Sequence, residues 1–504
     1  MSNIRGLPWR SPVFVAALLA GILAYTALAV ALARARKPWN DEAMSASAGY
    51  SLATRGYLAN PLFDENDPAM RGIHRHVYYI LPGQMIIMAL WYRIVGFSLF
   101  TTRVLSMLWT AILFCALYRL VRILSSNAML ALLATALTAL DYQIVSAASF
   151  GRYDTMVAAL GFSAYALFLS LRERKFTLAV VGANTLVAAA AFTHPNAVVY
   201  FLGLWFLILF YDWRRIRVTQ VALAALPYLI GGAALGWYIL QDIPDFKAQI
   251  LGNTGHRVGL FHPVQSIIDE IQVRYMAAYG LASYLPGHAP PFVRVKAIAL
   301  LGYLAGVAGC LLTPSIREQA GFRVLLMLTG VHFLFFTLYE GMKFNYYLVH
   351  MLPFYLSLLA VFVYYLWSRR PVLKLAVAGG VAVIVAVGVG GALMRVHVND
   401  MGNAYDPAVA FVKQHAGPND LIFASSSFGF GYGFRPNLVD DISFGLFSGW
   451  RPRFIVMEEI YEGNAQLSQI NAPAVDAHYR KLMADYRVVY NNGSYKVLER
   501  STAN

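Results

Sequence analysis

The first long polar segment, residues 39–76, carries residue types that do chemistry at short spacing. Asp41 and Glu42 are adjacent carboxylates, and His74 and His76 follow at the end of the segment with an arginine between them. A carboxylate takes a proton from a hydroxyl in general base catalysis, and cationic groups hold a phosphate. The segment therefore predicts a site where a hydroxyl is deprotonated beside a bound phosphate. A helix N-terminus with a charged first turn explains the two acids as well.

The composition sets the class of protein around this segment. Hydrophobic residues make up 59% of the 504 residues, charged residues make up 13%, and the mean hydropathy is +0.54. These values indicate a polytopic helical membrane protein. The net charge is +14, but the lysines and arginines lie in short clusters between apolar runs, so we assign them to membrane topology and exclude nucleic acid as a partner. The two cysteines, Cys115 and Cys310, lie in apolar runs, which excludes a disulfide framework and a cysteine metal site.

Apolar runs long enough to cross a bilayer alternate with short basic loops along most of the chain. The first run, residues 12–33, is longer than the core of a signal peptide and predicts an uncleaved anchor helix. The later runs are residues 102–119, 127–146, 154–171, 176–193, 195–212, 219–240, 294–313, 321–340, 345–367 and 371–395. The basic loops assign one face to the cytoplasm. We predict about eleven membrane helices in a multi-pass protein of the cytoplasmic (inner) membrane, with the N-terminus inside and the C-terminus outside.

Residues 78–96 form one further apolar stretch, for which this alternation of basic loops leaves no room. The stretch is short and contains Pro82, so we expect a juxtamembrane helix lying along the outer membrane surface, within a first outer loop of residues 34–100. Three cations then lie outside against the positive-inside rule: Arg34, Arg36 and Lys37. Cations on that side suit a lipid-phosphate site, and interfacial anchoring explains them as well.

The same topology brings further ionisable residues to the outer face, although they are far apart in the sequence. These are Arg152, Asp154, His194 and Lys343. Ionisable residues at membrane depth are costly and are functional by default. Each also has a simple structural explanation, such as an ion pair between Arg152 and Asp154 or a lysine that reaches the headgroups. Taken together they favour one shared site, with Asp141 as a further partner for Arg103 or Arg152.

The chain changes to the composition of a soluble domain at about residue 396. Residues 406–415 predict an amphipathic helix, residues 421–424 and 454–457 predict buried strands, and residues 486–499 predict a hairpin that turns at Asn491-Asn492-Gly493. We therefore expect a membrane domain over residues 1–395, with a second long outer loop at 241–293, and a small extracytoplasmic α/β domain over 396–504. The small domain carries no nucleotide-binding fingerprint.

Several motifs resemble those of GT-C glycosyltransferases, most closely the protein O-mannosyltransferase and aminoarabinose transferase group. They are Asp41-Glu42-Ala43, Ala48-Gly49-Tyr50, Arg55-Gly56-Tyr57, His76-Val77-Tyr78-Tyr79-Ile80, residues 95–103, Arg152-Tyr153-Asp154 and Lys343-Phe344-Asn345-Tyr346-Tyr347 with Pro353. The likeness runs through the membrane domain and does not extend to the small domain. It implies the GT-C fold, an all-α membrane domain with juxtamembrane helices in the first outer loop, and a polyprenyl-phosphate-linked sugar as the donor.

The resemblance also implies roles for single residues. Asp41, the first acid of the loop, corresponds to the catalytic base, Glu42 to an acceptor or supporting group, and Asp154 to a second polar constellation. The candidate donor-phosphate residues, from the resemblance and the topology together, are Lys343, Tyr346, Arg103, Arg152, His76, His74 and His194. The family's loop usually reads His-Pro-Pro or Lys-Pro where this chain has His76-Val77-Tyr78, so the chain departs from the pattern at this position.

The leading hypothesis is an inverting glycosyltransferase that moves a hexosyl or pentosyl group from a polyprenyl phosphate to a hydroxyl of lipid A, a glycan or a protein. A carboxylate takes the proton while lysine and arginine stabilise the departing phosphate. This scheme needs no cofactor and is compatible with a divalent cation. A transporter or flippase of a lipid-linked or acidic solute predicts an internal repeat and polar groups at mid-membrane. A sensor with a ligand-binding outer domain is the third hypothesis. The sequence shows no convincing repeat, and its polar residues gather at one face, which favours the enzyme.

Overall fold

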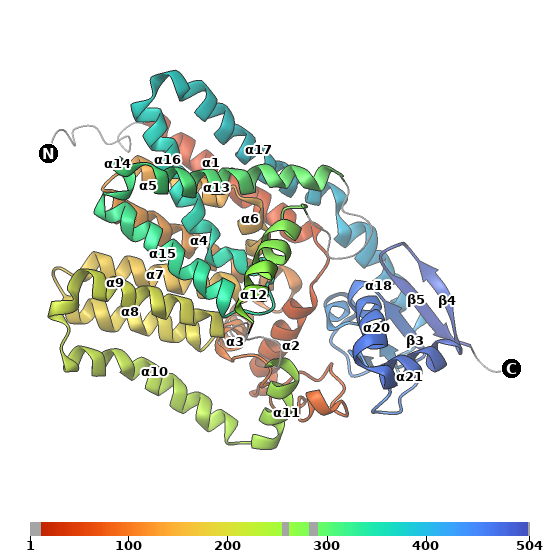
Figure 1. Cartoon of the computed structure of the whole chain (residues 1–504). Helices are drawn as coiled ribbons and strands as arrows, with labels where there is room; N and C mark the ends of the chain where they lie inside the picture. Colours follow the sequence, from red (N-terminus) through yellow and green to blue (C-terminus); the bar gives the residue numbers. More distant parts are fainter. Residues whose placement is uncertain (1–11, 255–261, 282–290, 502–504) are drawn as a thin grey trace.

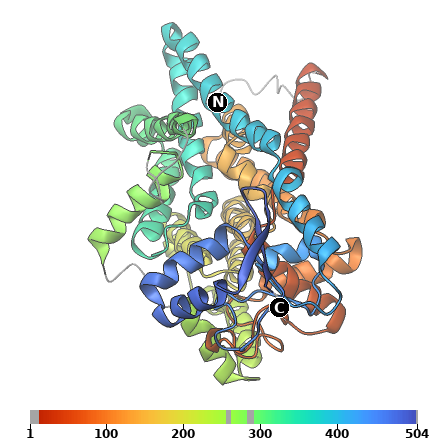
Figure 2. The ribbon, with the colours of Figure 1, turned by 90° about the vertical axis from the view of Figure 1, so that its right-hand side faces the viewer.

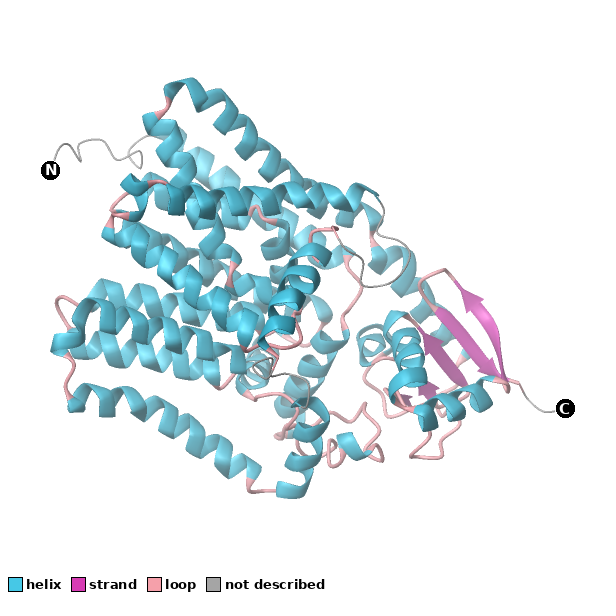
Figure 3. Ribbon diagram, in the orientation of Figure 1, coloured by secondary structure: helices cyan, strands magenta, loops and turns pink. Residues whose placement is uncertain are grey.

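The computed structural model describes residues 12–254, 262–281 and 291–501. Figure 1 shows a body of helices with a smaller domain beside it, and Figure 3 shows that the strands lie in this smaller domain. Figure 2, seen from that side, places the strands in front of the helical body. The predicted division into a helical membrane domain and a small α/β domain is thus present, and we call the second part the cap.

The body is built from α1 (Pro12–Ala35), α2 (Asn40–Arg55), α3 (Gly83–Val95), α4 (Leu99–Ser125), α5 (Ala128–Ala139), α6 (Tyr142–Ala148), α7 (Asp154–Leu171), α8 (Phe176–Ala191), α9 (Val198–Asp212), α10 (Val218–Ile239), α11 (Ile243–Thr254), α12 (Pro263–Asp269), α13 (Ala297–Leu312), α14 (Pro314–Arg317), α15 (Ala320–Leu338), α16 (Leu352–Arg369) and α17 (Lys374–Val398). Two short helices matter for the site: the π-helix η6 (Glu270–Ala277) and the 3₁₀-helix η8 (Asn345–His350).

Nine helical segments of the described residues are long and apolar enough to cross a membrane. The predicted span at 127–146 is not one straight helix, because α5 and α6 meet at a bend of 69°. Asp141 is the physical reason: its side chain accepts hydrogen bonds from the backbone N–H groups of Gln143 and Ile144 and so begins a new helix. Counting this bent pair and the apolar 16-residue α8 with the nine gives the eleven spans predicted.

The predicted juxtamembrane stretch forms α3, which has 13 residues and is too short to cross a bilayer. It packs closely against α2, the helix that begins with the two candidate acids. Gly49 permits this approach, because a Cβ atom there would lie 2.8 Å from the Cβ of Met88. The two short helices of the first loop therefore form one packed unit.

The cap contains a five-stranded sheet in the order β2-β1-β3-β5-β4. The strands are β1 (Ile422–Phe423), β2 (Leu438–Val439), β3 (Phe454–Met457), β4 (Tyr486–Asn491) and β5 (Lys496–Arg500), and the helices are α18 (Asp406–His415), α19 (Gly429–Tyr432), α20 (Glu459–Asn471) and α21 (Pro473–Met483). β1 runs parallel to β2 and β3, whereas β5 pairs antiparallel with β3 and β4. The predicted helix at 406–415, the two buried strands and the hairpin are all present.

The cap is joined to the first outer loop beside the candidate acids. The backbone N–H of Asp440, at the end of β2, donates to the carbonyl oxygen of Leu62 over 2.7 Å. The Ser426 hydroxyl donates to the Asn40 side chain at the start of α2. These contacts with the cap fix the N-terminus of α2, next to Asp41.

The topology generates a labelling prediction. In a protein whose two cysteines are replaced by alanine, we expect Arg55→Cys and Ser98→Cys, at exposed positions on either side of α3, to react with an impermeant thiol reagent from the outer side. The matched control is Arg174→Cys in the basic connection after α7, which should react only after permeabilisation. If Ser98→Cys also required permeabilisation, α3 would cross the membrane and the predicted topology would be wrong.

Candidate active site

A cavity of about 250 Å³ lies where the ends of several helices meet. Its walls come from the segment after α1, from the stretch that runs from α6 to the start of α7, from the end of η6, from the residue before α13 and from η8. The polar and aromatic side chains in its lining include Arg36, Trp39, Arg152, Asp154, Lys296 and Tyr346. The structure thus brings together residues from five distant parts of the sequence.

Arg152 connects the candidate acids at this cavity. Its Nε donates to Asp154 Oδ2 over 2.8 Å, and its Nη1 donates to Asp41 Oδ2. Its guanidinium carbon lies 3.8 Å from the ring centroid of Tyr346, a cation–π arrangement. The loop before α7, the first turn of α2 and η8 are therefore held in one geometry by one side chain.

The three predicted catalytic acids differ in how open they are. The Asp41 side chain is 35% exposed, whereas those of Asp154 and Glu42 are 3% and 0% exposed. The hydrogen bond from Arg152 uses Asp41 Oδ2, and Asp154 Oδ1 is buried without a partner among the described residues. Asp41 is thus the acid to which a solvent-borne group has access.

Glu42 and Arg103 form a fully buried pair beneath the site. Arg103 Nε and Nη2 each donate to one Glu42 oxygen over 2.8 Å, and Glu42 Oε1 also accepts from the backbone N–H of Gly151. Gly151 is required here, because a Cβ atom would lie 2.4 Å from the Thr102 side chain. The other Arg103 N–H groups donate to the carbonyl oxygens of Ala33, Arg36 and Lys37. All the N–H groups of Arg103 therefore have protein acceptors, and Glu42 supports the loop before α7.

Lys343 is buried in a separate ion cluster. Its Nζ lies 3.3 Å from Glu270 Oε2 and donates to the carbonyl oxygens of Phe336 and Thr337. Arg274 of η6 pairs with the same Glu270, also on η6, and with Glu340, which follows α15. Burial lowers the pKa of Lys343 and raises the pKa of Glu270. The expected contact of Lys343 with the donor phosphate is not supported, because a carboxylate and two carbonyl groups already occupy its ammonium.

The predicted histidines lie apart from one another. His74 lies 3.4 Å from Glu65, within the first loop. His76 forms a hydrogen bond with Gln241 over 3.0 Å, at the contact between the first loop and the segment after α10. His194 stacks on Tyr153, the neighbour of Arg152, with ring centroids 4.6 Å apart. Among the three, His194 alone lies beside the Arg152 network, and none is in the described lining of the cavity.

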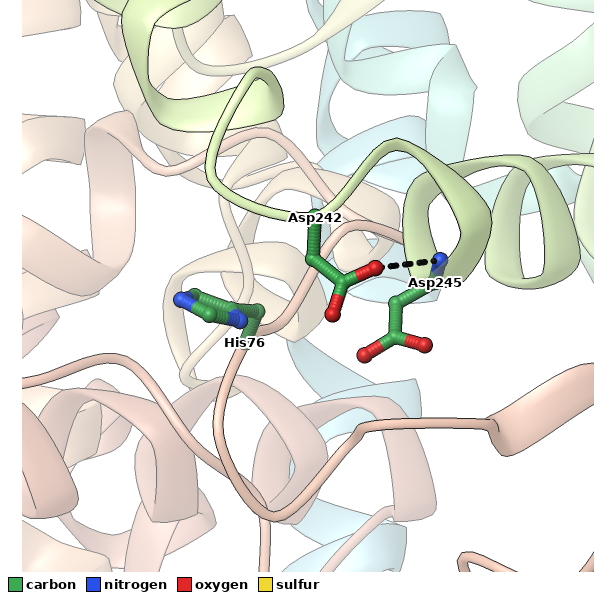
Figure 4. Close-up of side chains that lie close together, drawn as sticks. All are labelled: His76, Asp242 and Asp245. Carbon is green, nitrogen blue, oxygen red and sulfur yellow. Dashed lines mark hydrogen bonds between the residues drawn. The ribbon is translucent and has the colours of Figure 1, made fainter.

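His76, Asp242 and Asp245 offer possible metal ligands within 4.8 Å of one another (Figure 4). Arginines already balance the two acids: Arg71 lies 3.0 Å from Asp245, and Arg75 lies 3.3 Å from Asp245 and 3.7 Å from Asp242. A divalent cation would have to compete with these guanidinium groups. The cluster therefore forms ion pairs between the first loop and the start of α11.

Two cations that line the cavity, Arg36 and Lys296, were not among the predicted site residues. Arg36 was visible in the sequence only as one of three cations on the unexpected side of the membrane, and Lys296 gave no signal. Asp141 was expected to pair with Arg103 or Arg152, and this is wrong: it caps α6 and accepts a hydrogen bond from Tyr303. The bend between α5 and α6 turns Asp141 away from the Arg152 network.

The Glu42–Arg103 pair generates a stability prediction. Glu42→Gln removes the counter-charge of a buried guanidinium, and loss of one partner of a buried ion pair costs about 3–5 kcal/mol. We expect a large fall in the thermal unfolding temperature of the purified protein. The control is Glu65→Gln, at an exposed side chain of the first loop, which should change the unfolding temperature much less. If Glu42→Gln kept wild-type stability and lost turnover, Glu42 would be a catalytic group instead.

No protein-family model and no curated protein matches this sequence, whereas solved structures match its fold. The apo crystal structure of ArnT from Cupriavidus metallidurans superimposes with a TM-score of 0.63 at 13% identity, over 96% of this chain and 98% of that one. ArnT bound to undecaprenyl phosphate gives 0.59 at 13% identity, over 95% and 97%. The apo oligosaccharyltransferase of Archaeoglobus fulgidus gives 0.55 at 11% identity, over 91% and 72%.

At these identities the likeness establishes the fold. ArnT and the archaeal oligosaccharyltransferase are GT-C enzymes, and the superposition covers nearly the whole of this chain, cap included. The resemblance to GT-C glycosyltransferases noted in the sequence is therefore confirmed, and the chain is a multi-pass membrane protein with the GT-C fold.

Proposed function

We propose that the protein is a glycosyltransferase that moves one sugar from a polyprenyl-phosphate donor to an acceptor hydroxyl at the outer face of the cytoplasmic membrane. The observation that carries the proposal is the pairing of one accessible acid, Asp41, with Arg152 beside a cationic cavity at the outer ends of the membrane helices. The fold shared with ArnT, which was crystallised with undecaprenyl phosphate, supports the donor class.

In the proposed reaction the acceptor oxygen attacks the anomeric carbon as the bond from that carbon to the phosphate oxygen breaks. The two bonds lie in line, so the configuration inverts. The acceptor proton passes to Asp41, and the electron pair of the broken bond leaves with the lipid phosphate. Arg152 orients Asp41 through Oδ2, which leaves Oδ1 for the acceptor hydroxyl. Asp154 and the ring of Tyr346 hold Arg152 from two other sides.

The acceptor is a lipid, a glycan or a protein, and the position of Asp41 favours entry from the outer side. Asp41 follows the linker after α1 and lies next to Asn40, which the cap contacts through Ser426. The acceptor would therefore approach between the first outer loop and the cap. The donor would approach from the bilayer, because the cavity lies among the ends of apolar helices.

A transporter of a lipid-linked solute is less well supported by the same residues. Transport needs polar groups near the middle of the membrane and broken helices around them. The paired groups instead lie at helix ends: Asp41 in the first turn of α2, Arg152 in the loop before α7, and Asp154 in the first turn of α7. The bend between α5 and α6 is the one broken span among the described helices, and its Asp141 is satisfied by helix capping and Tyr303.

The proposal predicts that Asp41→Asn lowers turnover by about 10²–10⁴-fold, because a positioned general base contributes about that much. Asparagine keeps the shape and removes the basic oxygen, so binding of the lipid phosphate should persist. The measurement is release of polyprenyl phosphate from a sugar-charged carrier by purified protein. The control is Glu65→Gln, an exposed acid of the same loop, which should keep wild-type turnover. Retained activity in Asp41→Asn together with loss in Asp154→Asn would assign the base to Asp154.

A further inference from the structure

Arg36 is a buried cation without a carboxylate partner among the described residues. The residue is 8% exposed and lines the cavity. Its guanidinium donates to Ser146 Oγ over 2.7 Å and to Ser149 Oγ over 3.3 Å, and it lies 3.7 Å from the centroid of the Phe150 ring. These groups are neutral, and burial lowers the pKa of Arg36 to about 9. A buried charge is costly unless it is paired, so the cavity lacks an anion beside Arg36.

Lys296 provides a second such cation on the opposite wall. It is half-buried at the start of α13, and its Nζ lies 4.7 Å from the centroid of the Tyr142 ring. No ion pair joins it to a carboxylate of the described residues. Arg152, the third cation of the lining, differs because Asp41 and Asp154 both pair with it. The cavity therefore holds two uncompensated positive charges, contributed by Arg36 and Lys296.

We propose that Arg36 and Lys296 together bind the single phosphate of the lipid carrier, and that they bind it more tightly after the sugar has left. This inference rests on the proposed function and assigns its donor-phosphate site. A sugar-linked carrier is a phosphodiester with one negative charge. The released carrier is a phosphate monoester with a charge of about −1.5 to −2 at pH 7. Two cations match the monoester, so their attraction grows as the glycosidic bond breaks, which is the differential binding that lowers a reaction barrier.

A second cavity adjoins this position. It is narrow, about 20 Å³, and shares Tyr142, Gln143 and Lys296 with the first. Its remaining walls are mostly apolar and come from α5, α13 and α17, including Ile384 of α17. Next to it α13 and α17 present apolar side chains outward, for example Leu301 at 64% exposure. The apolar walls of this cavity and the exposed apolar side chains of α13 and α17 favour a lipid phosphate over free phosphate as the ligand.

The test compares two lipids that differ by one charge, undecaprenyl phosphate and its methyl diester, in binding to the purified full-length protein in detergent. We expect the wild type to bind the monoester about tenfold more tightly, the effect of one charge-assisted interaction. The preference should vanish at pH 5, where the monoester carries a single charge. Inorganic phosphate should compete only weakly. Equal competition by inorganic phosphate would overturn the lipid part of the proposal.

Single substitutions test which cations bind the phosphate. Lys296→Gln should weaken binding of the monoester about tenfold and remove the preference over the diester, with little change in thermal stability, because its side chain makes no hydrogen bond to a described residue. Arg36→Gln should do the same, although its bonds to Ser146 and Ser149 join α1 to α6 and its stability must be measured in parallel. The matched control is Arg34→Gln, an exposed cation two residues away that is absent from the lining, which should bind both lipids as the wild type does.

Two outcomes would overturn this site. One is equal affinity of the wild type for monoester and diester. The other is wild-type binding by Lys296→Gln and Arg36→Gln with loss of binding in Lys343→Gln, which would move the phosphate to the Glu270 cluster. Failure of the proposed function looks different: the wild type and Asp41→Asn would both bind the lipids with the expected preference, while the wild type transferred no sugar. Binding and transfer therefore test the two proposals separately.

Discussion

The arrangement of the site depends on the ion pairs of Arg152. This guanidinium pairs with Asp41 from the first outer loop and with Asp154 from α7, and it stacks on Tyr346 from η8. Beneath it, the buried Glu42–Arg103 pair fixes the end of α1, the start of α2 and the loop that carries Arg152. Buried charges of this kind are stable only when each has its partner. The geometry of the first loop is thus fixed by electrostatic pairing rather than by apolar packing alone.

The cations at the outer face fall into two groups, which the sequence alone does not separate. Arg103, Arg152 and Lys343 are neutralised by carboxylates and hold segments together. Arg36 and Lys296 face the cavity without such partners among the described residues. A ligand phosphate gains most from the second group, because a paired guanidinium has already been compensated. We therefore propose that the phosphate binds in the space between α1 and α13, and not beside Lys343 after the end of α15.

The sequence predicts those features that depend on local pattern. Hydropathy and basic loops predict the membrane domain, and alternation and turn residues predict the helix at 406–415 and the hairpin of the cap, all of which are present. The bend at Asp141 was missed, because a helix cap inside an apolar run leaves the hydropathy unchanged. The burial of Lys343 was missed because its carboxylate partner, Glu270, comes from a distant π-helix. Ion pairs between distant segments form only in the folded chain, so a local sequence pattern does not predict them.

The central claim is that the donor phosphate lies between Arg36 and Lys296, within reach of the base Asp41. The most direct measurement is an experimental structure of the full-length protein with undecaprenyl phosphate bound. The account predicts phosphate oxygens in hydrogen-bond contact with the Arg36 guanidinium and the Lys296 ammonium, and a prenyl chain that leaves between α13 and α17. Phosphate density beside Lys343, or beside His76, Asp242 and Asp245, would contradict it.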